Sequence, residues 1–194
     1  MRNLEFKARI DDPKALQAKA RALGFDLWGD LRQTDTYFSV SGGRLKLRET
    51  AGFPAELVFY QRDEDGDFRP SDYKTTPIPD GEALRSMLTA ALGVRSVVRK
   101  RRTLLLLDTT RMHFANISVV AFSDTPSESR PSYIRLHLDV VEQLGDFVEL
   151  EVPVNDRNPD ELATAQLRHL LDELNLSADM GIRASYADLF TSQS

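Results

Sequence analysis

Charged side chains recur at every second position in five short segments of this sequence. These sets are Glu5, Lys7 and Arg9; Arg44, Lys46 and Arg48; Lys100 and Arg102; Arg135, His137 and Asp139; and Glu149 and Glu151. Residues two positions apart in a β-strand point to the same face, so each set would lie on one face of a strand. Lysine and arginine bind phosphate oxygens, whereas carboxylates bind hard divalent cations. The sequence therefore contains side chains suited to both kinds of ligand.

Two interpretations of these charged faces are open. Each face taken alone is most simply a strand face exposed to water, as in many antiparallel sheets. Five such faces, together with amphipathic helices that need an apolar sheet face to cover, favour a closed sheet with the charges inside. Buried like charges are costly without a counter-ligand, and a polyanion with a divalent cation would satisfy both signs. A barrel of about eight strands is wide enough for one small ligand.

The apolar pattern around these sets predicts strands separated by a few helices. Alternation predicts strands at 3–10, 33–40, 44–48, 56–62, 71–76, 97–107, 134–140 and 147–154, and helical spacing predicts helices at 11–24, 80–93 and 159–174. The second helix has Leu84, Met87, Leu88 and Leu92 on one face. Pro77 and Pro79 are expected to end the strand before them, and Trp28 to be a packing anchor in a loop. The order is typical of an α+β fold with a mainly antiparallel sheet.

Composition and charge limit the class of protein. The chain has 194 residues, 41% of them hydrophobic and 28% charged, which is typical of a globular protein of one domain or of two small ones. It has no cysteine, which excludes disulfides and thiolate metal sites. The net charge of −5 argues against bulk nucleic-acid binding. Because the sequence also shows neither a signal-peptide pattern nor a bilayer-length apolar run, we expect a cytoplasmic protein without a membrane partner.

Several of these segments form an ordered series along the chain. They are Asn3 to Lys7, Gln33 to Phe38, Gly43 to Glu49, Val98 to Arg102, Leu138 to Glu151, and Ser185 to Leu189. In this order they resemble the CYTH family, also called triphosphate tunnel metalloenzymes. That family includes class IV adenylyl cyclases, thiamine triphosphatases and inorganic triphosphatases. The sequence departs from the family pattern at Asn3, which replaces the first glutamate of a Glu-x-Glu-x-Lys strand, and at Tyr60, where a lysine is common.

The resemblance implies a fold and a set of roles. The fold is a closed or nearly closed antiparallel β-barrel with helices packed outside. Phosphate oxygens would be bound by Lys7, Lys46, Arg48, Lys100 and Arg102, with Arg44 and Arg62 either as auxiliary contacts or exposed to solvent. Mg²⁺ or Mn²⁺ would be bound by Glu5, Glu149 and Glu151. Catalysis would involve Glu5, Lys7 and Asp139, the last by organising the metal or water.

One stretch interrupts the family pattern. Arg111 to Phe114 and Arg135 to Leu138 share an Arg-apolar-His-apolar order, and joining Arg111 to Leu136 gives a continuous family-like strand. We therefore predict an insertion at about 112–135 within a single domain spanning 1–194. Two origins remain open, a surface loop near the mouth of the barrel or a stretch absent from the mature message.

The sequence thus predicts a divalent-metal-dependent enzyme that hydrolyses an inorganic or organic triphosphate. Two alternatives are an adenylyl cyclase that makes cyclic AMP from ATP, and a non-catalytic protein that binds polyphosphate or nucleotide. Hydrogen bonding inside the barrel is the expected role of His137, with general base catalysis as the alternative. The expected partner is a small molecule bearing a triphosphate, and the sequence is compatible with a monomer or a homodimer.

Overall fold

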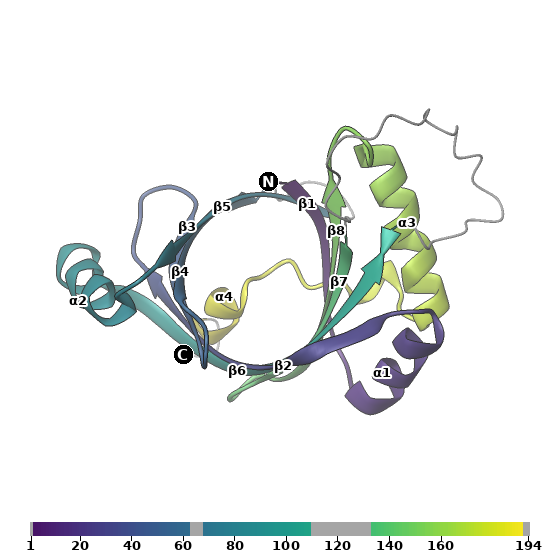
Figure 1. The fold of residues 1–194 in the computed structure, drawn as a ribbon, viewed down its shortest axis with the longest axis horizontal. Helices are drawn as coiled ribbons and strands as arrows, with labels where there is room; N and C mark the ends of the chain where they lie inside the picture. Colours follow the sequence, from purple (N-terminus) through teal and green to yellow (C-terminus); the bar gives the residue numbers. More distant parts are fainter. Residues whose placement is uncertain (1, 63–67, 110–132, 192–194) are drawn as a thin grey trace.

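The computed structural model describes residues 2–62, 68–109 and 133–191, and its strands form one closed barrel (Figure 1). The strands are β1 (Arg2–Arg9), β2 (Asp26–Phe38), β3 (Arg44–Thr50), β4 (Ala55–Arg62), β5 (Arg69–Ile78), β6 (Val94–Asp108), β7 (Tyr133–Val141) and β8 (Gly145–Val154). Their order around the barrel is β1-β5-β4-β3-β2-β6-β7-β8, and every neighbouring pair is antiparallel. The predicted α+β class and closed antiparallel barrel are confirmed.

Two helices cover the outer, apolar face of β1, β7 and β8. They are α1 (Pro13–Ala22) and α3 (Asp160–Leu174), which lie together on one side of the ring (Figure 1). Leu167, Leu170 and Leu174 of α3 pack with Phe6 and Leu150 of the barrel in one buried cluster. The start of α1 is the predicted one, because the side chain of Asp12 accepts a hydrogen bond from the backbone N–H of Ala15 at 2.9 Å. Since the apolar side chains of these strands face the helices, the alternating charged ones face the interior.

The helix α2 (Gly81–Leu92) lies at the opposite side of the ring and is much less covered (Figure 1). Its predicted apolar face forms, but Met87 is 62% exposed and Leu92 is 36% exposed. The last helix, α4 (Tyr186–Thr191), is short, and its Tyr186 and Ala187 are buried against residues of the barrel. No helix in the described ranges is long and apolar enough to cross a membrane.

The predicted loop at Trp28 is wrong. Strand β2 begins at Asp26, and its first half pairs with β6 alone because pairing with β3 begins at Gln33. A shift of register between Leu27 and Gly29 marks a bulge at this point. With no third strand beside it, Trp28 is 52% exposed and contacts Phe53, with ring centroids 6.0 Å apart. Trp28 is therefore a surface residue and not a packing anchor.

The predicted stop of β5 at Pro77 is also wrong, because the strand continues through Pro77 to Ile78; it ends directly before Pro79, as expected. Pairing of β5 with β1 ends at Asp72, so Pro77 has a strand neighbour on one side only, where it pairs with Glu56. An edge position tolerates the missing N–H of proline. Of the predicted insertion at about 112–135, residues 133–135 belong to β7, and the remainder lies outside the described residues.

Candidate functional site

The barrel encloses a cavity of about 370 Å³, which we call the barrel cavity. This volume lies within the range of roughly 300–1,000 Å³ that is common for small-molecule sites. Six cationic side chains line it: Lys7, Lys46, Arg48, Lys100, Arg102 and Arg135. They come from β1, β3, β6 and β7, so the closing of the sheet gathers them from distant parts of the chain. The predicted phosphate-binding residues Lys7, Lys46, Arg48, Lys100 and Arg102 are thus brought together.

Asp35 holds three of these cations in place. Its carboxylate is fully buried and accepts two hydrogen bonds from Arg48, at 2.8 and 3.0 Å. Lys46 and Lys100 donate to its Oδ2 at 3.1 and 3.3 Å. The sequence interpretation gave Asp35 no role in the site, although its spacing with Gln33 and Tyr37 already placed it on one face of a strand. Asp35 fixes the geometry of the cation cluster while itself remaining behind it.

Burial and charge set the protonation of this group. Burial by itself would raise the pKa of Asp35, but Arg48, Lys100 and Lys46 hold it well below its usual range. Burial lowers the pKa of Lys46 to about 7, and the nearby Arg48 charge acts in the same direction. Burial and Arg102 likewise lower the pKa of Lys100. An anion placed in the cavity would favour the protonated form of both lysines.

Asp139, a predicted catalytic residue, occupies a similar supporting position. It is 1% exposed and accepts two hydrogen bonds from Arg102, at 2.7 and 2.6 Å. The hydroxyl of Tyr186 in α4 also donates to it, at 3.0 Å. These contacts orient Arg102 and tie α4 to the barrel. A catalytic role for Asp139 stays a prediction, since its observed partners are Arg102, Lys100 and the tyrosine.

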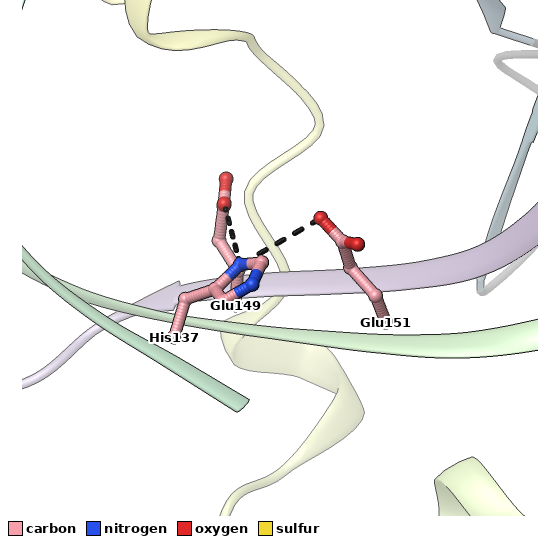
Figure 2. Close-up of side chains that lie close together, drawn as sticks. All are labelled: His137, Glu149 and Glu151. Carbon is pink, nitrogen blue, oxygen red and sulfur yellow. Dashed lines mark ion pairs between the residues drawn. The ribbon is translucent and has the colours of Figure 1, made fainter. Parts of the chain in front are cut away.

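Two carboxylates and an imidazole meet on the wall formed by β7 and β8. Figure 2 shows the ring of His137 between Glu149 and Glu151. Its Nδ1 lies 3.6 Å from Glu149 Oε2 and 3.6 Å from Glu151 Oε1. One ligand atom from each residue falls within 4.8 Å of the others, which makes this the candidate metal site within the described part of the chain. Glu149 and Glu151 were predicted as metal ligands, whereas His137 was not.

The donor set fits a divalent cation. Nδ1 of His137 is buried and has no hydrogen-bond partner among the described residues, so the expected hydrogen-bonding role is not seen at that atom. Burial and Arg102 lower the pKa of His137, which keeps the imidazole neutral and able to ligate. One nitrogen with carboxylate oxygens suits Mn²⁺ better than Mg²⁺, which prefers an all-oxygen shell.

The carboxylates of this site are already paired with cavity cations. Glu149 contacts Lys7 at 3.0 Å and Arg102 at 2.6 Å, and Arg135 donates to Glu151 at 2.8 Å. Burial alone would raise the pKa of Glu149, but Lys7 and Arg102 hold it well below its ordinary value. Arg135 in the same way lowers the pKa of Glu151 to about 2, against the effect of burial. Both carboxylates are therefore ionised at neutral pH.

The other predicted site residues are distributed differently. Glu5 lines the barrel cavity opposite Glu151 in the β1–β8 register, but it is not a member of the group with His137, and its role as a ligand stays a prediction. Arg44 donates to Asp188 of α4 at 2.9 Å. Arg62 ends β4, and its side chain lies outside the described part. Arg9, expected on the same face as Lys7, is exposed and lies over the ring of Phe147.

The two departures from the family pattern both face the cavity. Asn3 is 3% exposed beside the candidate metal site, and with its amide oxygen toward Arg135 it accepts a hydrogen bond of 2.7 Å. Tyr60 is 5% exposed, and the Nζ of Lys46 lies 5.6 Å from the centre of its ring. Lys46 thus reaches from the neighbouring strand into the space beside Tyr60.

Comparison with known families agrees with this geometry. The family model described as the CYTH domain matches residues 1–186. The chain belongs to the CYTH domain family. A protein of Methanocaldococcus jannaschii named "putative adenylate cyclase" is 28% identical over 195 residues, and the match covers 97% of this chain and 98% of that protein. The family resemblance expected from the charged segments is therefore confirmed.

Solved structures show the same fold. The PH1012 protein from Pyrococcus horikoshii has a TM-score of 0.72 at 19% identity, covering 96% of this chain and 98% of that one. A Hippeastrum protein described as a putative adenylyl cyclase that reveals a dominant triphosphatase activity has a TM-score of 0.59 at 15% identity, covering 99% and 96%. At these identities the likenesses concern the fold alone.

Proposed function

We propose that this CYTH protein is a metal-dependent enzyme that hydrolyses a triphosphate inside the barrel cavity. The observation that carries the proposal is the meeting, in one cavity, of a buried cation cluster with the ionised carboxylates Glu149 and Glu151 and the neutral imidazole of His137. The cations are suited to phosphate oxygens and the acidic group to a divalent cation. The triphosphatase activity named for the Hippeastrum protein of the same fold adds support.

The cavity residues would have three different roles. Lys7, Lys46 and Lys100 would hold phosphate oxygens by charge-assisted hydrogen bonds, and Arg48 and Arg102 by their planar guanidinium groups. His137, Glu149 and Glu151 would hold Mn²⁺ or Mg²⁺, with Glu5 within reach of the same wall. When bound, the metal neutralises phosphate charge and orients an attacking water. Asp35 and Asp139 keep the cations in place from behind.

The pairing of carboxylates with cations predicts that metal and triphosphate bind cooperatively. Lys7 and Arg102 neutralise Glu149 in the ligand-free protein, and Arg135 neutralises Glu151. A phosphate chain that takes over these cations leaves the two carboxylates to a metal ion. Either ligand binding alone would leave one side of these ion pairs buried without a counter-charge, whereas metal and triphosphate together would pair both sides.

A second candidate is an adenylyl cyclase. The name of the Methanocaldococcus relative favours it, and so do apolar side chains at one end of the cavity, Leu31 and Leu104, which suit an organic group on the triphosphate. The same phosphate and metal residues would serve, with the ribose hydroxyl in place of water. Product analysis separates the two activities.

The test is a phosphorus NMR time course with tripolyphosphate or ATP, in Mg²⁺ and then in Mn²⁺. Orthophosphate from either compound is the expected result, faster in Mn²⁺. Pyrophosphate together with cyclic AMP from ATP would replace the hydrolase with the cyclase. Line broadening by bound ligand without any turnover would refute both and indicate a non-catalytic binder. Glu142→Gln, at an exposed turn, is a matched control for substitutions of the cavity glutamates.

A further inference from the structure

Tyr186 comes from the short helix α4, yet its side chain lines the barrel cavity and is only 3% exposed. The helix is attached to the barrel by a different residue, Asp188, which accepts hydrogen bonds from Arg44 of β3 at 2.9 Å and from Arg95 of β6 at 2.6 Å. These bonds involve no atom of the tyrosine. The place of Tyr186 inside the cavity therefore calls for an explanation other than the attachment of α4.

Two of the predicted phosphate-binding lysines lie against the ring of Tyr186. The Nζ of Lys7 is 4.1 Å from the ring centre and the Nζ of Lys100 is 5.2 Å from it, both within the distance of about 6 Å at which an aromatic ring attracts a cation. The lysines come from β1 and β6, and they are 4% and 5% exposed. Such attraction is stronger for a buried cation than for one at the surface. One ring thus draws two ammonium groups from different strands toward the same point.

The hydroxyl of the same side chain acts on a third cation. It donates to Asp139 at 3.0 Å, and Asp139 in turn accepts two hydrogen bonds from Arg102, at 2.7 and 2.6 Å. The Asp139 carboxylate also lies 3.9 Å from the Nζ of Lys100. Because Asp139 is only 1% exposed, water competes little for these contacts. Tyr186 therefore influences Lys7 and Lys100 directly and Arg102 through Asp139.

An aromatic ring is suited to position a cation that must also bind a ligand. A carboxylate, such as Asp35 at 3.1 Å from Lys46, neutralises much of the charge of its lysine. A ring attracts the same charge through its quadrupole and leaves the charge of the ammonium group in place. An ammonium group has three N–H donors, so a lysine held by a ring can exchange its other partners for phosphate oxygens without leaving its position.

We propose that Tyr186 is a positioning residue for triphosphate binding. Its ring holds Lys7 and Lys100 where they reach the phosphate chain, and its hydroxyl holds Arg102 there through Asp139. This inference rests on the proposed binding of a triphosphate in the barrel cavity. It gives α4 a part in the phosphate site in addition to its packing against the barrel.

The test measures tripolyphosphate affinity by calorimetry in EDTA, where metal-dependent turnover does not interfere. Tyr186→Leu, which removes both the ring and the hydroxyl, should weaken binding about tenfold, the range of two contacts between a cation and a ring. Tyr186→Phe, which keeps the ring, should weaken it only about threefold, the range of one hydrogen bond. Phe190→Leu is the matched control, because Phe190 lies in the same helix and packs against the same buried cluster. It should leave tripolyphosphate affinity unchanged.

A double-mutant cycle separates positioning from a merely structural role. Because Tyr186 acts partly through Lys7, Tyr186→Leu should weaken binding only about threefold in a Lys7→Ala background, where one of the two lysines is gone. Independent effects would instead add. The same tenfold loss in both backgrounds would therefore overturn the inference, and so would wild-type affinity of Tyr186→Leu.

The wild-type protein provides a measurement that does not depend on the folding of any variant. The ring current of Tyr186 should shift the ε-methylene protons of Lys7 upfield in the NMR spectrum. Ordinary lysine shifts for these protons would overturn the inference, and if tripolyphosphate still bound, the proposed function would stand. Failure of tripolyphosphate to bind the wild-type protein would refute the proposed function, and this inference with it.

Discussion

Asp35→Asn would remove one negative charge from the centre of the cation cluster while nearly preserving the shape of the side chain. The carboxylate is fully buried and bonded to Lys46, Arg48 and Lys100 at 2.8 to 3.3 Å. Removing one partner of a buried ion pair costs about 3–5 kcal/mol, because the remaining charge is left uncompensated. We expect the free energy of unfolding to fall by about this amount.

The size of the loss should depend on pH. Burial already lowers the pKa of Lys46 to about 7, and loss of Asp35 removes a charge that raises it. Above neutral pH, Lys46 can escape the penalty by losing its proton, whereas Arg48 cannot. The free energy of unfolding should therefore fall by about 3 kcal/mol at alkaline pH and by more at pH 6, within the range for a broken buried pair.

Urea unfolding followed by circular dichroism measures both quantities, because urea midpoints and slopes yield the free energy of unfolding. Asp72→Asn, at an exposed position of β5, is the control and should change stability little. Tripolyphosphate should stabilise Asp35→Asn more than the wild type, since the ligand replaces the lost anion. A loss below about 1 kcal/mol, or equal stabilisation of both proteins by the ligand, would contradict a central role for Asp35.

Three further predictions concern the barrel cavity. Glu149→Gln or Glu151→Gln should lower metal-dependent turnover, measured by phosphorus NMR, by at least about 100-fold, while circular dichroism should show the fold retained. Turnover as fast as that of the control Glu142→Gln would contradict the metal site. Lys7→Ala should weaken tripolyphosphate binding about 10- to 100-fold by calorimetry, because a charge-assisted hydrogen bond is lost, and unchanged affinity would exclude Lys7 from the phosphate site. Because the pKa of Lys46 is about 7, its charge is lost as pH rises through 7, so tripolyphosphate affinity should fall from pH 6 to 8 and Lys46→Arg should flatten that profile.

The local pattern of the sequence was sufficient for much of the fold. Alternation in Asn3 to Ile10 and Phe147 to Val154 predicts strands with one charged face, and the capping residues Asp12 and Asp80 mark where α1 and α2 begin. These features are local, since strand period and capping depend on residues a few positions apart. The same reasoning failed at Trp28 and Pro77, where the number of neighbouring strands decides what a residue can do.

The site depended more strongly on tertiary structure. The sequence alone indicated which side chains could bind phosphate or metal, because charges at every second position share a face. It did not indicate that Asp35 would join Lys100, 65 positions away, or that His137 would stand between Glu149 and Glu151. Those contacts arise from strand order and register, which place β2 beside β6 and β7 beside β8. The burial of Tyr37 and Tyr60 was likewise decided only when α4 packed against the barrel, because burial depends on what covers a residue and not on its place in a local pattern.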